Sequence, residues 1–325
     1  MKALVLEAYN TPHRLTDMPR PVPAKGEVLV RIRASGINPL DVKIKAGQAA
    51  HAKNRLPSIL GLDLSGTVES VGEGVTAFAP GDEVYGMTGG IAGVPGTLAE
   101  YAAVDADLLA RKPAGLTFRE AAALPLSLIT AWEGLVDRAG VHEGQTVLVH
   151  GGAGGVGHVA VQLSKAMGAT VYATVSARHF ALMESYGAIP IDYTATPPDA
   201  YMSLHTGGLG FDVVYDTLGG ATLDASFTLV KRYTGHVISI LGWGTHSLAP
   251  LSFRGATYSG VFTLYPLISG EGRAHHGEIL RQAAALIDAG RIRPLMDATP
   301  YTMDTIADAY AAIERRNGRV VIDIG

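Results

Sequence analysis

The sequence has 325 residues, of which 47% are hydrophobic and 17% charged, and its formal net charge is −4. This composition excludes a disordered chain and leaves room for two domains, while a net negative charge without a basic run argues against nucleic acid as a partner. The absence of cysteine excludes disulfides, thiolate metal ligands and cysteine nucleophiles.

The N-terminus carries the short apolar run Ala3–Leu6, which is too short for a signal peptide. The chain also has no run of about 18 apolar residues, the length that a membrane-spanning helix needs. We therefore expect a cytoplasmic protein with no membrane partner.

Residues 1 to about 120 are predicted to be rich in strands and turns. Short strands are indicated at Val28–Ile32, Leu64–Val71 and Asp82–Tyr85, with glycine and proline between them. This spacing favours a compact, barrel-like domain rather than alternating strands and helices. An alanine-rich helix over Arg119–Ala123 marks the change to a different pattern.

The middle of the chain, from about 125 to 260, alternates strands and helices as an α/β protein with a parallel sheet does. The expected strands are Thr146–Val149, Thr170–Val175, Ile189–Asp192, Phe211–Tyr215, His236–Ile240 and Ala256–Phe262. The remaining C-terminal part is predicted to hold helices over 277–289 and 305–316 and a final strand over 319–324.

A glycine cluster at 151–157 follows the first of these strands and precedes a helix. Gly152, Gly154 and Gly157 fit the spacing G-x-G-x-x-G, and Gly151, Gly154 and Gly157 equally fit G-x-x-G-x-x-G. Such glycines allow a sharp turn, let backbone N–H groups approach a pyrophosphate and let the helix pack closely on the strand. Because a strand, a helix and a second strand frame the cluster, it predicts dinucleotide binding rather than a merely structural turn.

The end of the second strand indicates which dinucleotide is bound. NAD sites usually carry an acidic residue about 20 residues beyond the glycines, where it bonds the ribose 2′-OH. No acidic residue occurs between Glu143 and Glu184, and the strand ends instead in Ser176, Ala177 and Arg178. A hydroxyl and a guanidinium can hold a 2′-phosphate, so NADP(H) is the expected cofactor. The alternative is that Arg178 is only a solvated residue at the start of the next helix.

Several motifs resemble those of the zinc-independent quinone oxidoreductase branch, the zeta-crystallin-like branch, of the medium-chain dehydrogenases/reductases. Besides the glycine cluster, they are GINPLDVK at 36–43, GLDLSGTV at 61–68, PGDEVYG at 80–86, QLSK at 162–165, GRI at 290–292 and GRVV at 318–321. The resemblance covers essentially the whole chain. It implies a GroES-like catalytic domain of residues 1–123 and 264–325, a Rossmann domain of residues 124–263, and a homodimer.

This branch differs from the zinc alcohol dehydrogenases at the metal-ligand positions. The resemblance places Asn38 where those enzymes have a cysteine and Leu62 where they have a histidine. Asparagine is a poor zinc ligand and leucine is none, so no metal site is expected. The neighbouring His275 and His276 are interpreted as a solvated helix start.

Without a Lewis acid, hydride can still pass from a dihydronicotinamide to an acceptor that is already electrophilic, such as a quinone or an α,β-unsaturated carbonyl. The resemblance implies catalytic residues Asn38, Asp41 and Lys43 on a loop facing the nicotinamide. Asn38 and Asp41 could equally be structural, with Asp41 fixing the loop through backbone hydrogen bonds. Gln48 stands where many relatives have a tyrosine, so the proton could come from solvent.

The cofactor contacts are carried over from the family position by position. Thr130 is expected at the nicotinamide end, Gly152 to Val156 around the pyrophosphate, and Ser176, Arg178 and Tyr193 around the 2′-phosphate. Tyr193 could instead only cap the strand before it. The pyrophosphate set is Gly152, Ala153, Gly154, Gly155 and Val156, and further contacts are expected from Gly219, Leu241, Phe262 and Asn317.

The sequence therefore predicts an NADPH-dependent oxidoreductase that acts on a small electrophilic substrate. The alternative is an enoyl-thioester reductase, which shares the fold and the cofactor. Its larger substrate needs a basic entrance for the coenzyme phosphates. The arginines and lysines of this sequence are too scattered to show whether such an entrance exists. The third hypothesis is a structural or sensor protein that binds NADPH without catalysing a reaction.

Overall fold

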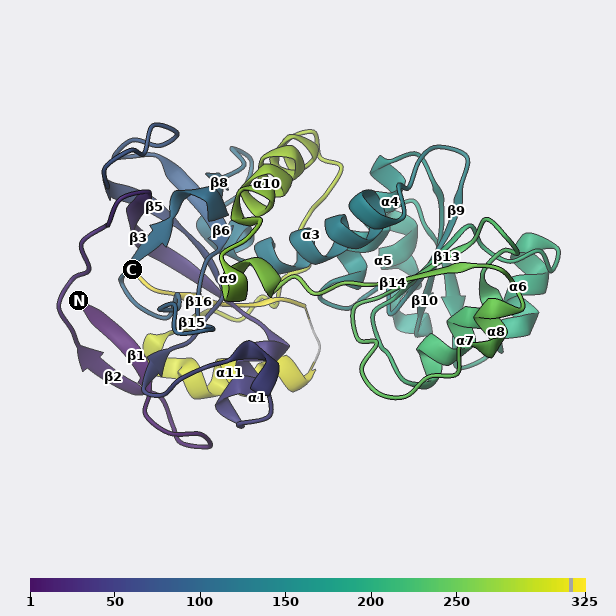
Figure 1. Ribbon diagram of the computed structural model, residues 1–325, viewed down its shortest axis with the longest axis horizontal. Helices are drawn as coiled ribbons and strands as arrows, with labels where there is room; N and C mark the ends of the chain where they lie inside the picture. Colours follow the sequence, from purple (N-terminus) through teal and green to yellow (C-terminus); the bar gives the residue numbers. More distant parts are fainter. Residues whose placement is uncertain (316–317) are drawn as a thin grey trace. The chain divides into compact units, whose positions relative to one another are not determined.

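The computed structural model describes residues 1–315 and 318–325 of the chain. The chain divides into two compact units, which are coloured by sequence in Figure 1. Unit 1 comprises Met1–Ile129, Leu264–Gly290 and Pro294–Gly325, and unit 2 comprises Thr130–Thr263 and Arg291–Arg293. The division predicted from the sequence fell after residue 123 and again after residue 263.

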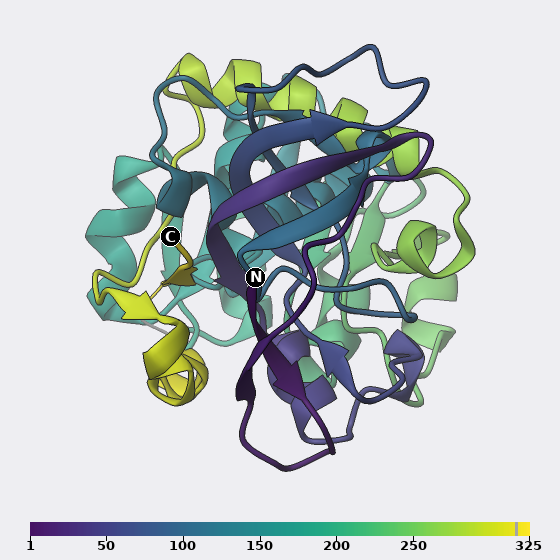
Figure 2. The ribbon, with the colours of Figure 1, turned by 90° about the vertical axis from the view of Figure 1, so that its left-hand side faces the viewer.

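Unit 1 is built on a large, mostly antiparallel sheet, seen in Figure 2. Its strands are β3 (Glu27–Ile37), β5 (Asp63–Val71), β6 (Glu83–Met87), β7 (Tyr101–Asp105), β8 (Leu109–Arg111), β15 (Tyr301–Thr302) and β16 (Val320–Asp323). They run in the order β15-β16-β3-β5-β6-β8, and β7 also pairs with β3. A smaller sheet joins β1 (Lys2–Leu6), β2 (Arg14–Asp17) and β4 (Ser58–Ile59) in the order β2-β1-β4.

The central strand β3 shows why the N-terminal part folds this way. Val30 and Ile32 are buried, whereas Arg31 and Arg33 are exposed, so the alternation of the sequence is the alternation of the two faces of the sheet. The strand continues to Ile37, five residues beyond its predicted end, because its last residues pair with β16 from the far end of the chain. The C-terminal segment thus completes the sheet that the N-terminal part begins.

The helices of unit 1 are α1 (Pro39–Lys45), α2 (Phe118–Ala122), α9 (Tyr265–Ser269), α10 (Arg273–Asp288) and α11 (Ile306–Arg315), with short turns of 3-10 helix η1 (Ala50–Ala52), η2 (Ala106–Leu108) and η5 (Met303–Thr305). Helix α3 (Pro125–Trp132) begins in unit 1 and ends in unit 2.

The interpretation of His275 and His276 as a solvated helix start is wrong for His276. Helix α10 begins at Arg273, and His276 is fully buried. The first turn of α10 lies against η2, so closely that a Cβ on Gly277 would be 2.5 Å from the carbonyl oxygen of Asp107. Sequence alone could not show this contact, because the two segments are far apart in the chain.

Unit 2 is a six-stranded sheet in which all strands are parallel. Its strands are β9 (Thr146–His150), β10 (Thr170–Val175), β11 (Ile189–Asp192), β12 (Val213–Asp216), β13 (His236–Ser239) and β14 (Thr257–Gly260), in the order β11-β10-β9-β12-β13-β14. The order reverses between β9 and β12, as in a doubly wound dinucleotide-binding sheet. The predicted fold class is confirmed.

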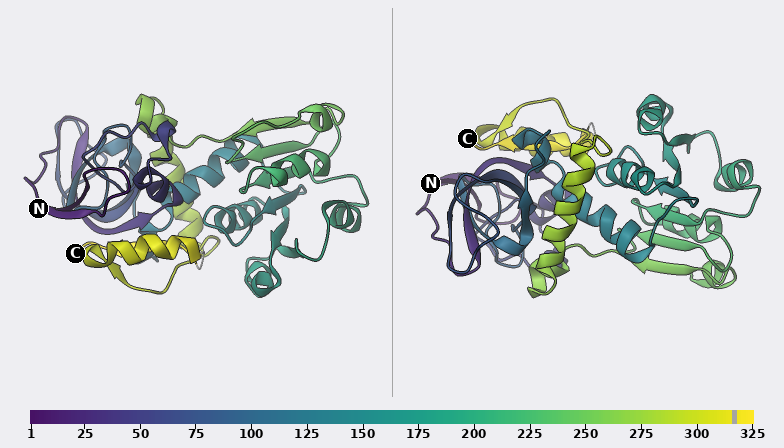
Figure 3. Two further views of the ribbon diagram at one scale, coloured as in Figure 1. Left: turned by 90° about the horizontal axis from the view of Figure 1, so that it is seen from below. Right: turned by 90° about the horizontal axis from the view of Figure 1, so that it is seen from above.

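The helices of unit 2 cover both faces of this sheet (Figure 3). They are a π-helical segment η3 (Glu133–Arg138), α4 (Gly157–Ala166), a 3-10 turn η4 (Ala177–His179), α5 (Phe180–Ser185), α6 (Pro198–Thr206), α7 (Ala221–Leu229) and α8 (Ala249–Ser252). Since both faces are covered, the middle of the central strand β9 is apolar, and Val147, Leu148 and Val149 are all fully buried. Among the residues described, no helix is long and apolar enough to cross a membrane.

Candidate functional site

The glycine cluster forms the turn between β9 and α4. Gly151 has a φ of +73°, a conformation that favours glycine. A Cβ on Gly157, the first residue of α4, would lie 2.1 Å from the carbonyl oxygen of Gly151, and one on Gly152 would lie 2.8 Å from the Cβ of Ala173. These two positions therefore need glycine so that α4 can pack on the strands.

The same turn presents backbone groups that a ligand can reach. Gly154 and Gly155 are exposed, at the N-terminus of α4. Within the described part of the chain, no acceptor is recorded for the N–H groups of Ala153 and Gly155. Free N–H groups at a helix N-terminus bind anions such as a pyrophosphate. The turn fits the phosphate part of a dinucleotide, and it contains the predicted Gly152–Val156 set.

Ser176, Arg178 and Tyr193 lie after β10 and β11, at the carboxyl ends of two neighbouring strands. Val175 and Asp192, the last residues of these strands, are paired in the sheet. The Arg178 side chain is exposed, and no ion pair is recorded for it among the described residues. Tyr193 is 61% exposed, which leaves its ring accessible rather than packed as a cap. The structure thus places a cation and two hydroxyl groups on one edge of the sheet.

The remaining predicted cofactor residues lie on or beside the other half of the sheet. Thr130 is buried: its Oγ1 lies 3.0 Å from Thr263 Oγ1, and its carbonyl accepts a hydrogen bond from Tyr215. Gly219 follows β12, Leu241 follows β13, and Phe262, which is 41% exposed, follows β14. Asn317 lies outside the described residues.

Two residues that the sequence analysis did not single out organise these turns. The buried Asp216, at the end of β12, accepts hydrogen bonds from the N–H of Gly219 and from Ser239 Oγ at 2.7 Å. Ser239 Oγ in turn accepts from the N–H of Leu241 at 3.2 Å. Burial raises the pKa of Asp216, against the hydrogen bonds that lower it. Their position at the carboxyl ends of β12 and β13 was the available signal.

In unit 1 the side chain of Asn38 belongs to a buried polar group. Its Nδ2 donates to Asp63 Oδ2 at 3.0 Å, and its Oδ1 accepts from the guanidinium of Arg319 at 2.7 Å. Arg319 also donates to Asp63 at 3.2 Å and to the carbonyl of Ala123 at 2.8 Å. We call Asn38, Asp41, Asp63 and Arg319 the Asn38 network; all four are at least 95% buried.

Asp41 completes this network from the first turn of α1. Its carboxylate accepts the N–H of Asn38 at 2.8 Å and the N–H of Gly61 at 3.1 Å. Burial raises its pKa to about 7, although these hydrogen bonds lower it; burial likewise raises the pKa of Asp63 to about 6 against the opposing effect of Arg319. Asp41 therefore makes the backbone hydrogen bonds that are expected if its role is to fix the loop.

Lys43, the third predicted catalytic residue, behaves differently from Asn38 and Asp41. It lies on the exposed side of α1. Burial lowers the pKa of His51, and the charge of Lys43 lowers it further, so the two side chains are close enough to interact. Of the three residues, Lys43 is exposed, whereas Asn38 and Asp41 are buried.

Within the Asn38 network, the amide oxygen and the amide nitrogen of Asn38 both form hydrogen bonds with neighbours in unit 1. By resemblance, Asn38 occupies a zinc-ligand position, yet here its oxygen accepts from a cation. Among the residues that the structure describes, no group of three histidine, cysteine, aspartate or glutamate side chains is arranged to hold a metal ion. Asp63 and Arg319 belong to the motifs at 61–68 and 318–321, but the local sequence does not predict their pairing with Asn38.

Comparison with known families and proteins places the chain among related enzymes. Residues 24–114 match the alcohol dehydrogenase GroES-like domain, and residues 187–322 match the zinc-binding dehydrogenase family. The chain is 36% identical over 310 residues to a 2-methylene-furan-3-one reductase of Solanum lycopersicum (91% of this chain, 71% of the relative). It is 34% identical over 310 residues to a chloroplastic NADPH-dependent alkenal/one oxidoreductase of Arabidopsis thaliana (91% and 72%).

A solved structure is similar over the full length. It is that of an alcohol dehydrogenase superfamily protein from Novosphingobium aromaticivorans, which is 55% identical, covers 100% of both chains and has a TM-score of 0.98.

Proposed function

The chain belongs to the medium-chain dehydrogenase/reductase family, and from this premise we propose that it is an NADPH-dependent reductase of α,β-unsaturated carbonyl compounds that needs no zinc. Quinones are a second class of acceptor with the same electronic demand. The names of the two plant relatives, a 2-methylene-furan-3-one reductase and an alkenal/one oxidoreductase, support the enone class.

The turn before α4 and the edge beyond β10 support the choice of cofactor. Ala153 and Gly155 offer N–H groups to a pyrophosphate, and Arg178 offers an exposed guanidinium to a 2′-phosphate. Bound NADPH would supply a hydride from its dihydronicotinamide ring. The protein's part is to hold and orient the reactants and to stabilise the charge that develops on the acceptor.

The observation that carries the proposal is the closed hydrogen bonding of Asn38. Its amide oxygen accepts from Arg319 at 2.7 Å and its amide nitrogen donates to Asp63 at 3.0 Å. A side chain bound in this way is poorly suited to ligate a metal, and Leu62 offers no ligand atom. An acceptor activated by its own conjugation fits such a site better than an alcohol that must first be ionised.

Within this proposal the three predicted catalytic residues have different tasks. Asn38 and Asp41 fix the start of α1 through buried contacts and act by positioning. Lys43, on the exposed side of that helix, is proposed to place its ammonium group near the oxygen of the acceptor, where negative charge appears during reduction.

The test is a panel of acceptors followed by the loss of NADPH or NADH absorbance, with and without a chelator. The panel contains an enone, an enal, a quinone, an enoyl-thioester and a saturated aldehyde. Reduction of the enone or quinone by NADPH, unchanged by the chelator, is the expected result. Activity on the saturated aldehyde alone, lost with the chelator, would overturn the zinc-free proposal.

Two other outcomes distinguish the remaining alternatives. A clear preference for the enoyl-thioester would identify an enoyl-thioester reductase. Binding of NADPH without reduction of any acceptor would favour a non-catalytic sensor or structural protein. Isothermal titration with NADPH makes this last outcome distinct from a failure to bind the cofactor.

A further inference from the structure

A histidine lies beside the residues that are expected to hold the 2′-phosphate of NADPH. It is His179, the last residue of η4, which joins β10 to α5. Its Nδ1 is 3.2 Å from Oγ of Ser176, the residue that precedes η4. Arg178 is exposed between them in the chain, and Tyr193 follows the neighbouring strand β11. The structure thus adds an imidazole to the cation and the two hydroxyl groups at this edge of the sheet.

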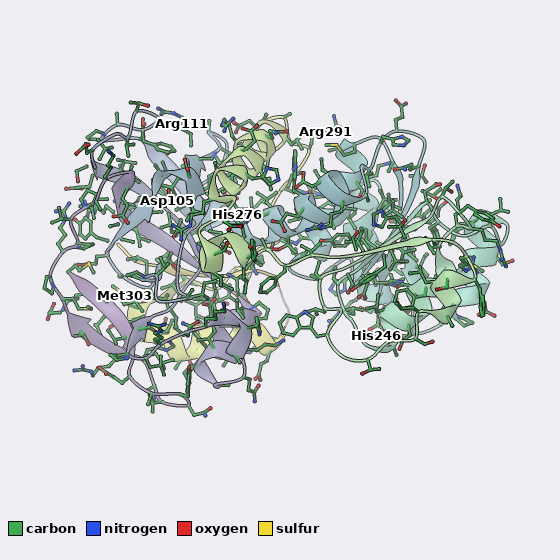
Figure 4. All side chains as sticks on the ribbon, viewed as in Figure 1. Asp105, Arg111, His246, His276, Arg291 and Met303 are labelled. Carbon is green, nitrogen blue, oxygen red and sulfur yellow. The ribbon has the colours of Figure 1, made fainter. Side chains whose placement is uncertain are left out.

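The second ring nitrogen of His179 is open to solvent. Within the described part of the chain, Nε2 has no recorded partner, and it is not among the buried atoms that lack one. His246, labelled in Figure 4, is the contrasting histidine of unit 2. Its Nδ1 is 2.8 Å from Asp224, its Nε2 is buried, and its side chain is only 12% exposed. A ligand can therefore approach the ring of His179, whereas the ring of His246 is packed against protein.

The surroundings of His179 favour the neutral ring when no ligand is bound. Burial lowers the pKa of His179, and the positive charge of Arg178 lowers it further. The elements next to η4 carry two carboxylates, Glu184 in α5 and Asp192 at the end of β11. Neither of them is a cause of this shift, and Oδ1 of Asp192 accepts hydrogen bonds from Thr194 instead. A phosphate bound beside the ring would act in the opposite direction and favour its protonation.

The hydrogen bond between Ser176 and His179 depends on the charge of the ring. A neutral ring with its proton on Nε2 can only accept at Nδ1, so the Ser176 hydroxyl must donate its hydrogen to the ring. A neutral ring with its proton on Nδ1 carries a lone pair on Nε2 and offers no donor there. The imidazolium donates from both nitrogens, so Ser176 Oγ accepts from it and its own hydrogen can go to a phosphate oxygen. Protonation therefore adds a charge and completes the set of donors.

We propose that His179 makes the choice between NADPH and NADH depend on pH. Its imidazolium holds the 2′-phosphate together with Arg178 and the hydroxyl of Ser176, and the neutral ring holds it more weakly. This inference rests on the cofactor of the proposed function. NADH has a 2′-hydroxyl in place of the phosphate and brings no charge to the ring. NADPH therefore takes up a proton as it binds and NADH does not, so the preference for NADPH falls as the pH rises.

Calorimetric titration with NADPH and NADH at pH 6.5, 7.5 and 8.5 tests the inference. For the wild type, the Kd of NADPH should rise by about 3- to 10-fold between the lowest and the highest pH, which is within the value of one charge-assisted hydrogen bond. The Kd of NADH should change by less than about twofold, because its 2′-hydroxyl does not respond to the charge of the ring. The 2′-phosphate itself gains a proton near about pH 6, and this effect is common to every variant.

His179→Gln removes the charge and keeps a polar side chain. Its Kd for NADPH should match that of the wild type at pH 8.5 and change little down to pH 6.5, while its Kd for NADH should equal that of the wild type and so show that the variant is folded. The matched control is His205→Gln, in the last turn of α6. Burial also lowers the pKa of His205, whose ring lies 4.8 Å from that of Tyr172. This variant should keep the pH dependence of the wild type.

Two readouts without turnover follow the proton itself, with 2′,5′-ADP as the probe. Titrations at pH 7.5 in buffers of different ionisation enthalpy should show that the wild type takes up a fraction of a proton and that His179→Gln takes up none. The ¹⁵N signals of His179 should titrate at a higher pH when the probe is bound. Ser176→Ala should weaken NADPH binding more at pH 6.5 than at pH 8.5, because the neutral ring already engages the hydroxyl.

The failures can be told apart. If NADPH reduces the enone but its binding has the same pH dependence in the wild type and in His179→Gln, the inference is overturned and the proposed function stands. A pH dependence that NADH shares would also overturn it, because the effect would not act through the 2′-phosphate. If no acceptor is reduced, yet proton uptake with 2′,5′-ADP is lost in His179→Gln, the proposed reaction fails and the inference is supported. Absence of binding by NADPH and by 2′,5′-ADP would overturn both.

Discussion

The Asn38 network of unit 1 and the carboxyl edge of the sheet in unit 2 are both rich in polar groups, but they use them in opposite ways. In the network, Asn38, Asp63 and Arg319 are buried and bond one another. Along the edge, Arg178 is exposed, and Ala153 and Gly155 offer N–H groups for which the described residues provide no recorded acceptor. Polar groups that satisfy one another stabilise a fold, whereas polar groups left open are suited to bind a ligand.

This difference predicts which substitutions change stability and which change ligand binding. A change in the network should lower the free energy of unfolding even without cofactor. A change along the edge should leave the apoprotein nearly as stable and weaken the binding of NADPH.

The largest effect on stability is expected for Arg319→Met. It leaves Asp63 buried without its cation and removes the donor to Asn38 Oδ1. Breaking a buried ion pair in this way costs about 3–5 kcal/mol. Urea unfolding of the apoprotein should show this loss, and the matched change Arg111→Met, in an exposed ion pair with Asp82, should cost less than about 1 kcal/mol. Similar losses for the two variants would mean that the network does not hold unit 1 together.

Gly157→Ala should affect both properties, because it lies where the edge meets the core. Its Cβ would be 2.1 Å from the carbonyl of Gly151, so α4 or the turn must move. We expect a loss of about 1–3 kcal/mol in stability, typical of overpacking, and weaker binding of both NADPH and NADH. Gly154→Ala is the comparison: its Cβ would be 3.1 Å from the same oxygen, so stability should change far less. Thermal unfolding with and without cofactor checks both variants.

Arg178→Ala tests cofactor binding at the carboxyl edge of the sheet separately from stability. The side chain is exposed and makes no recorded ion pair with the described residues, so the stability of the apoprotein should stay within about 0.5 kcal/mol of the wild type. Binding of NADPH should weaken by about 1–3 kcal/mol, the value of a charge-assisted hydrogen bond, while NADH binding should hardly change. Calorimetric titration with the two cofactors measures the difference. Equal weakening for both would show that Arg178 does not contact the 2′-phosphate.

The sequence predicted the edge better than the network for a physical reason. The glycines, Ser176 and Arg178 lie within about one strand–helix–strand unit, so their spacing reveals their common position. The partners in the network are residues 38, 63 and 319, which meet only when β5 and β16 both pair with β3. In unit 2 the predicted strand limits lie within two residues of the observed ones, whereas β3 of unit 1 extends five residues beyond its predicted end. Phe211, expected in β12, instead forms an isolated bridge with Val230.

The smallest effect, and the finest test of the network, is the pH dependence of Asp41. Its folded-state pKa is raised to about 7, so the native state binds a proton that the unfolded chain releases near the ordinary value of 3.8. The contribution of Asp41 to stability is therefore complete below about pH 4 and is lost as the pH rises through about 7.

Asp41→Asn removes this titration while keeping a side-chain oxygen that can accept one of the two backbone N–H groups. The variant should be less stable than the wild type by about 1 kcal/mol at pH 5, for the hydrogen bond that is lost. The deficit should shrink by pH 8, because the wild type then carries a buried carboxylate whose desolvation the variant avoids. Urea unfolding across pH 4–8 measures this change. A deficit that grows with pH would mean that the carboxylate is stabilised as an anion, and that the network favours charge at Asp41 more strongly than burial opposes it.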